Sequence, residues 1–338
     1  MQSLFSYKDC LTPLNKIESI TIFLNHKEGC KYTIAIPTYN RVSDLKLALE
    51  SAINQNYVHD YNIIVVDNNP ARNDDTELMM LKHYQHSDNV SYFKNTLNVG
   101  MINNWNKLFL LSDTEYVIML HDDDVIFGNY LSVMDMILAA EGNVATINGG
   151  KKLWNGAKQL IGNRICTEKS IEVYQYSKYS NYPFFHFGAP SGCLFSKSAF
   201  IEEGGFDTDA YPSSDYVFIQ KLCLSGKKVL SVKDHIMLYR TGTNTTAKIE
   251  TALAWLKIDK EIKEQLGGIL HLPPFFVHIV EYFELKLRVR RVCKTKPNYK
   301  YERWTKGSKL FLVFFRIYRY LHVCTIKRKK INKGLMDL

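Results

Sequence analysis

The chain has 338 residues, 46% of them hydrophobic and 13% aromatic, which is enough to bury one large domain with additions or two domains. Its formal net charge is +9, and a basic excess of this size suits an anionic substrate, an anionic membrane surface or nucleic acid as the partner. No run of about 20 apolar residues occurs, which excludes a membrane-spanning helix.

The first half of the chain alternates strand and helix patterns. Residues 1–30 form an N-terminal extension in which residues 20–24 suit either a short strand or part of a helix. After it, β-rich apolar runs predict strands, and apolar residues at helical spacing predict the helices between them. The expected strands are 32–36, 61–66, 90–93 and 116–120, and the expected helices start near Ser43, at 74–84 and after Gly100. This order predicts a parallel α/β sheet with its functional residues at the carboxyl ends of the strands.

Three consecutive carboxylates follow the last of these strands: Asp122, Asp123 and Asp124. They repel one another, and burying them without partners would cost several kcal/mol. A hard divalent cation would cancel this repulsion and would hold a diphosphate against the protein. A solvated acidic turn between a strand and a helix is the alternative, and charge alone does not decide between the two.

Polar residues also end two other strands of the pattern. One strand stops at Asp67, and another stops at Pro37, which cannot donate to a ladder and is followed by Thr38 and Asn40. A nucleotide is a natural ligand at such a rim. Asp67 would accept from a base N–H, Thr38 and Asn40 would hold the ribose or the base, and the acidic triplet would take a metal diphosphate. For Asp67 alone, the alternative is a cap for the turn that follows it.

Three segments carry a resemblance to a known family: residues 35–41 (AIPTYNR), 64–68 (IVVDN) and 120–124 (LHDDD). In this order and spacing they resemble glycosyltransferase family 2, the inverting nucleotide-sugar enzymes. The resemblance covers about residues 31–246 and implies an α/β GT-A fold there, that is, a Rossmann-like nucleotide-diphospho-sugar transferase. Residues 247–338 are then a basic, amphipathic, mostly helical C-terminal extension.

The same resemblance implies a donor site. In the family, the loop after the first strand and the aspartate after the second bind the nucleoside, and the D-x-D motif binds Mg²⁺ or Mn²⁺ and the donor diphosphate. The donor-binding residues implied here are Pro37, Thr38, Tyr39, Asn40, Arg41, Asp67, Asn98, Asn106, Asp122, Asp123 and Arg240, and the implied metal ligands are Asp122 and Asp124. Within the triplet, Asp122 is expected to face the nucleotide sugar and Asp124 the metal.

Two positions of the donor site depart from the family pattern. Many members carry an arginine just before the residue that matches Asn106, where this chain has Trp105. The family's closing segment often reads Y-R-x-H, and Gly242 replaces the histidine here, so the donor and waters are expected to complete the metal's coordination. Arg240 in the same segment would counter the diphosphate, with a structural ion pair as the alternative.

The second half of the chain carries the match to the catalytic base. Residues 189–207 resemble the family's strand and helix that lead to G-G-F-D, and Asp215 then matches the catalytic aspartate, with Ser214 in place of the usual glutamate. A carboxylate there would take the proton of a sugar hydroxyl as that oxygen attacks the anomeric carbon. Without the resemblance, residues 213–215 are the N-cap region of a helix, and the two roles are compatible.

From residue 249 onward the composition becomes basic and amphipathic. Lysine and arginine accumulate between residues 286 and 296, and the aromatic block 310–321 is followed by the run KRKK at 327–330. This mixture favours a helix that lies in an anionic membrane interface. The alternative is a helix packed on the catalytic domain with a solvated basic tail. No nucleic-acid-binding motif or zinc knuckle is present, so nucleic acid is not expected as a partner.

The cysteines and the N-terminus indicate the compartment. The seven cysteines are odd in number and include no C-x-x-C pair, which indicates the reduced thiols of a cytosolic protein. The first ten residues lack a basic region followed by an apolar core, so no signal peptide is expected. We therefore expect a cytoplasmic protein, peripheral on the inner face of the cell membrane.

Together these features predict a metal-dependent inverting hexosyltransferase that uses Mn²⁺ or Mg²⁺. It would move a sugar from a nucleoside-diphosphate donor, a UDP-sugar rather than a dTDP-sugar, to a hydroxyl of a glycan acceptor. A lipid-linked acceptor in bacterial surface polysaccharide synthesis (O-antigen or capsule) suits the basic C-terminal region by analogy. The alternative is a membrane-associated nucleotide-sugar-binding subunit without turnover, which Ser214 and Gly242 keep open.

Overall fold

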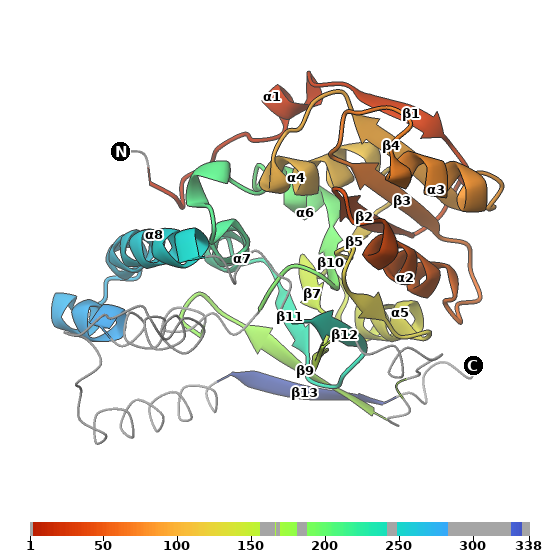
Figure 1. Cartoon of the computed structure of the whole chain (residues 1–338). Helices are drawn as coiled ribbons and strands as arrows, with labels where there is room; N and C mark the ends of the chain where they lie inside the picture. Colours follow the sequence, from red (N-terminus) through yellow and green to blue (C-terminus); the bar gives the residue numbers. More distant parts are fainter. Residues whose placement is uncertain are drawn as a thin grey trace.

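A mixed ten-stranded sheet forms the centre of the molecule (Figure 1). The computed structural model describes residues 3–155, 166, 170–180, 188–241, 249–282 and 326–332. The strand order across the sheet is β1-β4-β3-β2-β5-β10-β7-β11-β9-β13. In chain order these strands are β1 (Ser19–Phe23), β2 (Tyr32–Thr38), β3 (Asn62–Asp67), β4 (Val90–Asn95), β5 (Tyr116–Met119), β7 (Thr146–Asn148), β9 (Ser170–Tyr176), β10 (Cys193–Ser196), β11 (Val229–Val232) and β13 (Lys327–Asn332).

The part of the sheet made of β4, β3, β2 and β5 is parallel, as the sequence predicts. Every residue of these four strands is buried, which explains why they read as continuous β-branched and aromatic runs. Their side chains point alternately to the two faces, so that Ile34 and Ile36 join one core cluster and Ala35 joins the other. Both faces of the sheet must therefore be covered.

Helices provide this cover in an α/β/α sandwich. One core cluster contains residues of α2, α3 and α5, and the other contains residues of α4, α6 and α7. The predicted α/β class is thus confirmed. The helices in chain order are α1 (Thr12–Asn15), α2 (Val42–Ile53), α3 (Asp75–Tyr84), α4 (Met101–Leu111), α5 (Tyr130–Glu141), α6 (Lys197–Glu202), the 3₁₀ turn η2 (Thr208–Ala210), α7 (Ser214–Leu224) and α8 (Ile249–Ile269).

A second, small sheet lies beside the end of β5. It consists of β6 (Val125–Ile126), β12 (Met237–Arg240) and β8 (Lys151–Trp154), in the order β6-β12-β8. Since β6 begins immediately after the acidic triplet, this sheet brings the chain near residue 240 and the chain near residue 151 to the triplet. The parallel pattern of the sequence did not predict this second sheet.

The N-terminal extension packs on the sheet rather than standing apart from it. The ambiguous run is a strand, β1, which pairs antiparallel with β4 and forms one edge of the sheet. Before it, Leu4, Leu11 and Leu14 are buried. The N-terminal extension therefore contributes an edge strand to the central sheet.

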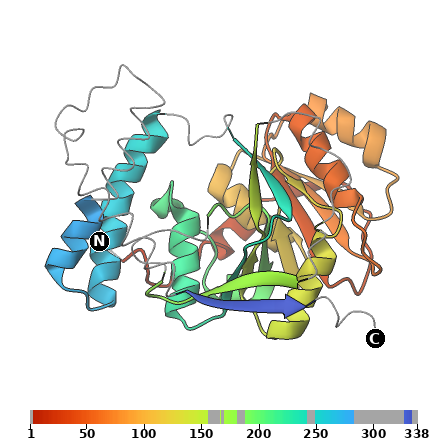
Figure 2. The ribbon, with the colours of Figure 1, turned by 90° about the horizontal axis from the view of Figure 1, so that it is seen from below.

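The C-terminal region contributes both a helix and a strand. Helix α8 agrees with the prediction, but Lys327–Asn332 forms β13, which pairs antiparallel with β9 at the other edge of the sheet (Figure 2). The sequence predicts a mostly helical region over residues 247–338, and these six residues form a strand that it did not predict. The reason is the pairing partner: Ile331 is buried opposite Ile171, and Lys329 reaches Glu141 at 2.5 Å.

Several predicted features lie outside the described residues. They are the basic cluster 286–296, the aromatic block 310–321 and Gly242. Among the described helices, none has the length and apolar character needed to cross a membrane. In the described part, Cys10, Cys30, Cys193 and Cys223 are free thiols.

Candidate functional site

The carboxyl ends of three parallel strands meet at one edge of the sheet. Strand β2 pairs on one side with β3, where Thr38 lies opposite Asp67, and on the other side with β5, where Ala35 lies opposite Met119. The loops that follow these strands therefore leave the sheet side by side, as expected for an open α/β sheet.

Asp122 is held by the loop that follows β2. Its Oδ2 accepts from Thr38 Oγ1 at 2.9 Å, and its Oδ1 lies 3.4 Å from Arg41 Nη1. The same guanidinium contacts Asp123 Oδ2 at 3.0 Å. Burial raises the pKa of Asp122 to about 7, although the Arg41 charge opposes this shift. The structure thus joins two of the three segments that carry the family resemblance.

The rest of that loop is open to solvent. Tyr39 and Asn40 are exposed, and Asn40 has a left-handed backbone conformation (φ 54°). Asn69 Nδ2 donates to Asn40 Oδ1 at 2.8 Å and so ties this loop to the one after β3. Pro37 is buried within β2, opposite Val66. Of the predicted loop residues, Tyr39 and Asn40 are therefore the most exposed to a ligand, and Arg41 is partly exposed.

A cluster that fits a divalent cation lies next to this loop. One ligand atom each of His121, Asp123 and Asp124 lies within 4.8 Å of the others. Asp124 Oδ1 accepts from the Arg240 backbone N–H at 2.7 Å, while Asp124 Oδ2 and His121 Nε2 are buried and have no hydrogen-bond partner among the described residues. Burial lowers the pKa of His121 to about 4, which keeps its ring neutral and able to coordinate. Carboxylate and imidazole ligands together suit Mn²⁺.

The composition of this cluster differs from the predicted metal pair. Asp124 belongs to it as expected, but Asp122 does not, because its two oxygens face Thr38 and Arg41. His121 was not predicted at all, although it directly precedes the triplet in sequence. Burial, followed by repulsion from Asp123, raises the pKa of Asp124 to about 7, which is the strain that a bound cation would relieve.

Two contacts orient His121. Its ring stacks on Trp105, with the centroids 5.1 Å apart and the planes 24° apart. Its backbone N–H donates to Ser191 Oγ at 3.0 Å. Trp105 occupies the position where many family members carry arginine, and here it supports a candidate metal ligand. The position of the family arginine is thus taken by a ring that packs on the imidazole of His121.

Asp67 has the environment of a buried cap. Its Oδ1 accepts from the Asn69 backbone N–H at 2.9 Å, and its Oδ2 accepts from Tyr92 Oη at 2.8 Å and from Lys94 Nζ at 3.1 Å. Its side chain is fully buried, and burial raises its pKa. The structure therefore shows the capping role that the sequence left open, and contact of Asp67 with a nucleoside base stays a prediction.

The two predicted asparagines have different surroundings. Asn106 is fully buried and clamps a backbone turn: its Nδ2 donates to Phe206 O, and its Oδ1 accepts from Phe206 N, both at 2.9 Å. Because both ends of its amide are engaged there, Asn106 does not join the rim. Asn98 does lie at the rim, where its Oδ1 accepts from Asn68 Nδ2 at 2.8 Å.

Gly205 shows why the turn beneath Asn106 needs glycine. Its φ is +78°, and an added Cβ would lie 3.0 Å from Asn106 Oδ1 and 2.8 Å from a methyl carbon of Leu11. Both the left-handed conformation and the close approach therefore disfavour any larger residue.

Arg240 forms a structural ion pair. Its guanidinium binds Asp44 on α2 and lies 5.8 Å from the ring centroid of Trp154. This is the alternative that the sequence left open, and it places the guanidinium against protein groups. The contribution of Arg240 to the acidic cluster is its backbone N–H, which holds Asp124.

Asp215 and Lys151 extend the site away from the nucleoside loop. Asp215 stands in the first turn of α7, as predicted. Lys151 Nζ contacts Asn148 Oδ1, and burial lowers the pKa of Lys151 against the opposing charges of Asp124 and Asp215. One ammonium group therefore experiences both the candidate metal carboxylate and the candidate base. Lys151 belongs to no sequence motif, and it reaches the candidate site because β8 is a strand of the second sheet.

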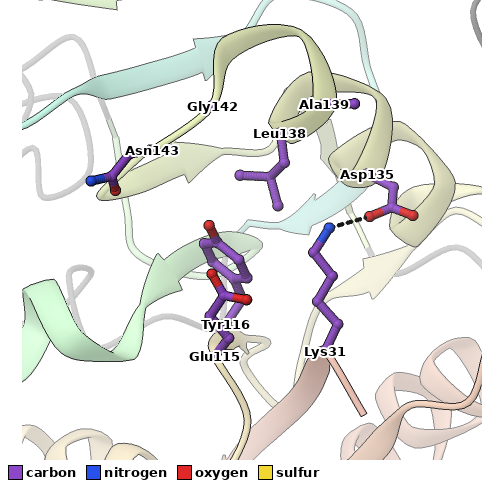
Figure 3. Close-up of a pocket in the computed structure, with 8 residues that line it drawn as sticks. All are labelled: Lys31, Glu115, Tyr116, Asp135, Leu138, Ala139, Gly142 and Asn143. Atoms are coloured by element: carbon purple, nitrogen blue, oxygen red, sulfur yellow. Dashed lines mark hydrogen bonds and ion pairs between the residues drawn. The ribbon is translucent and has the colours of Figure 1, made fainter. Parts of the chain in front are cut away.

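A pocket of about 690 Å³ lies elsewhere on the molecule (Figure 3). Its lining includes Lys31, which directly precedes β2, and Tyr116, the first residue of β5. There Asp135 accepts from Lys31 Nζ at 2.7 Å, and it also binds the hydroxyls of Tyr32 and Tyr57. The pocket lies at the amino ends of β2 and β5, whereas the acidic triplet follows the carboxyl end of β5. Its charged groups satisfy one another, so we assign it to packing between α5 and the sheet.

Comparison with known proteins identifies a family and one relative. The family model described as glycosyl transferase family 2 matches residues 33–204, slightly more than half of the chain. A GalNAc(5)-diNAcBac-PP-undecaprenol beta-1,3-glucosyltransferase of Campylobacter jejuni is 32% identical over 147 residues. That match covers 42% of this chain and 45% of the relative, so the chain matches less than half of the relative's length.

Solved structures share the fold at low sequence identity. Residues 1–349 of S. aureus TarS in complex with UDP-GlcNAc superpose with a TM-score of 0.57 at 14% identity, covering 80% of this chain and 77% of the other. A mannosyltransferase of Pyrobaculum calidifontis in complex with GDP-Man and Mn²⁺ gives a TM-score of 0.53 at 16% identity, covering 93% of this chain and 86% of the other. The predicted GT-A type of α/β fold is thereby confirmed.

Proposed function

The chain belongs to glycosyl transferase family 2, and from this membership we propose that it is an inverting glycosyltransferase for a nucleotide-sugar donor. The observation that carries the proposal is the buried cluster at the ends of β2 and β5. There, Asp124 Oδ2 and His121 Nε2 lack hydrogen-bond partners among the described residues, next to a loop that the family uses for a nucleoside. Unpartnered buried polar atoms at a rim of this kind point to a ligand that supplies the missing interactions.

The metal is proposed to be Mn²⁺ or Mg²⁺. Asp124, Asp123 and His121 would hold it, while Asp122 stays with Thr38 and Arg41 on the nucleotide side. When bound, the ion would stabilise the negative charge on the departing nucleoside diphosphate. Support comes from the similar fold of the Pyrobaculum protein, which holds Mn²⁺ together with GDP-Man. His121 would thus supply a histidine ligand, which the closing segment of this chain lacks because Gly242 replaces the family histidine.

The reaction is proposed to pass through Asp215. Its carboxylate would accept the proton of the acceptor hydroxyl as that oxygen forms a bond to the anomeric carbon of the sugar. The bond from the anomeric carbon to the diphosphate oxygen breaks at the same time, and the nucleoside diphosphate leaves with the electron pair. Attack from the face opposite the leaving group inverts the anomeric configuration. The first turn of α7 suits this role, because the helix N-terminus favours the ionised carboxylate.

The donor is proposed to be a UDP-sugar in preference to a dTDP-sugar. The S. aureus protein of the same fold was solved with UDP-GlcNAc, and the Pyrobaculum protein with GDP-Man. For this chain, Tyr39, Asn40 and Asn98 are the predicted nucleoside contacts that have exposed surface at the rim.

The acceptor is proposed to be a lipid-linked glycan of a bacterial surface polysaccharide, met at the inner face of the cell membrane. The name of the Campylobacter relative includes an undecaprenol-linked glycan. The net charge of +9 and the basic C-terminal sequence would favour contact with an anionic membrane surface.

A donor screen tests the proposal. Thermal unfolding would be followed with UDP-, dTDP- and GDP-sugars, each with and without Mn²⁺, and nucleotide release would be measured for every donor that stabilises the protein. We expect stabilisation by at least one UDP-sugar that depends on Mn²⁺, followed by release of UDP. Binding without release for every donor would favour the non-catalytic binding subunit instead. No stabilisation by any donor would contradict a nucleotide-sugar site.

A further inference from the structure

Helix α8 holds the first turn of α7, the turn that carries Asp215. Ser213 donates from Oγ to Asp259 Oδ1 at 3.1 Å, and Lys263 Nζ donates to Tyr216 Oη at 3.0 Å. All four residues are buried. Two side-chain hydrogen bonds from one helix therefore bracket Asp215 in the sequence.

The periodicity of the two helices explains this arrangement. Asp259 and Lys263 are four residues apart on α8, so they share one face of that helix. Ser213 and Tyr216 are three residues apart and share the face of α7 that meets it. Since successive helical residues are turned by about 100°, the side chain of Asp215 points roughly 130° away from the middle of that face. Helix α8 therefore contacts the back of the turn and leaves Asp215 directed elsewhere.

Charged groups are an unusual choice for this contact. Asp259 and Lys263 directly follow Ile258 and Ile262 on α8, which belong to one apolar cluster with Ala210 and Val217. A well-packed apolar pair at these two positions would be at least as stable. Lys263 Nζ also lies 4.8 Å from the ring centroid of Tyr216, in range of a cation–π interaction. Directional bonds of this kind define the rotation and height of a helix turn more sharply than apolar packing does.

Helix α8 is itself anchored to the segment before α7. Gln265 Oε1 accepts from Leu4 N at 2.8 Å and from Ser3 Oγ at 2.9 Å. The same N-terminal segment then binds the turn ahead of η2, through Cys10 N to Gly204 O at 3.0 Å and Lys8 Nζ to Asp207 at 2.6 Å. The N-terminal segment and α8 thus fix the turn that leads into α7 from two sides.

We propose that Asp259 and Lys263 are positioning residues that set the orientation of Asp215 toward the acceptor hydroxyl. The inference rests on the proposed function, because it assumes that Asp215 is the base. It assigns to α8, which the sequence placed outside the catalytic domain, a part in the catalytic step. A displacement of about 1 Å in a reacting group can lower a rate by about 100-fold, so these contacts can matter without touching a substrate.

The test compares single and double variants in nucleotide release. The donor used is the one with the fastest release in a panel of UDP- and dTDP-sugars with Mn²⁺, with water as the acceptor. Asp259→Ala, Lys263→Met and the milder Tyr216→Phe, which removes only the hydroxyl, should each lower kcat about 10-fold or more and leave KM for the donor nearly unchanged. In an Asp215→Asn background the same changes should cost less than about twofold, because the group that they position is gone.

Two controls separate positioning from folding. Asp259→Asn keeps an acceptor oxygen for Ser213 and should restore most of the rate that Asp259→Ala loses. Lys260→Met changes an exposed lysine of the same helix, which pairs only with Glu264 among the described residues, and should leave kcat unchanged. Equal losses with and without the Asp215→Asn change, or no loss from any variant, would overturn the inference. A normal rate in Asp215→Asn alone would instead remove Asp215 as the base and with it that part of the proposed function.

Discussion

Asp215 is the residue on which the proposed chemistry depends most. Asp215→Asn removes the carboxylate that accepts the proton but keeps the shape of the side chain. We expect the rate of sugar transfer to fall by about 10² to 10⁴, because general-base catalysis contributes on this order. Donor affinity should stay within about twofold, since none of the predicted donor contacts lies on α7. Rate measurements and isothermal titration with the donor would check both expectations.

His121 is predicted to be a metal ligand through Nε2. In His121→Gln the affinity for Mn²⁺ should fall about 10-fold or more, because a neutral nitrogen ligand is lost. A more direct measurement is pulsed electron paramagnetic resonance of bound Mn²⁺, which detects the coupling to a coordinated ¹⁴N nucleus. We expect this coupling in the wild-type protein and in the control His235→Gln, which changes an exposed histidine. A wild-type spectrum without it would contradict ligation by His121.

Asn106 should contribute to the stability of the protein rather than to donor binding. Asn106→Ala leaves the buried N–H and C=O of Phe206 without the amide that now satisfies them. We expect the free energy of unfolding to fall by about 2 to 4 kcal/mol, while nucleotide affinity changes little. Denaturant titration and nucleotide binding separate the two roles, with the partly exposed Asn103→Ala as control. A large loss of nucleotide affinity with unchanged stability would restore the donor contact that the family resemblance implies.

At the level of elements, β13 should be needed for the sheet. A variant that ends at residue 325 loses the buried Ile331, the ion pair between Lys329 and Glu141, and the six-residue pairing with β9. Its melting temperature should fall, and it should aggregate more, because β9 becomes an exposed edge strand. Light scattering during thermal unfolding measures both effects. A variant that ends at residue 332 is the control, and equal behaviour of the two would contradict a structural role for β13.

The elements that the sequence predicts well are those with local signals. Strands β2, β3 and β5 carry continuous apolar runs that end in polar residues, so both their type and their ligand-binding ends could be predicted. Strand β13 could not be, because its lysine-rich sequence resembles a solvated tail and becomes a strand only through pairing with the distant β9. The second sheet has the same origin, since β6, β8 and β12 are short strands contributed by three separate parts of the chain.

The site residues also differ in whether a local sequence signal marks them. The triplet and Asp215 stood out by charge and by family pattern. His121 and Lys151 did not, because their significance comes from burial and from the charges around them, which only the assembled sheets create. Asp67 and Asn106 show the converse: a family pattern marks the position, but the partners that occupy the side chain are settled by packing against Lys94 and Phe206.

At the level of the whole molecule, the net charge of +9 should show itself at membranes. We expect the protein to sediment with vesicles that contain phosphatidylglycerol or cardiolipin and to leave them as salt rises. The Debye length shrinks from about 10 Å at 0.1 M to about 3 Å at 1 M, which screens contacts of this kind. Neutral phosphatidylcholine vesicles are the control. Equal binding to both kinds of vesicle, or binding that salt does not weaken, would contradict an electrostatic contact.

The two edges of the central sheet come from the first and the last of the described strands, β1 and β13. During synthesis, β9 therefore emerges long before the segment that covers it. At about 5 to 20 residues per second, the roughly 150 residues between them take about 8 to 30 seconds to translate. For that time the nascent chain presents an unpaired strand edge, so the yield of folded protein should depend on translation speed and on chaperones that shield such an edge.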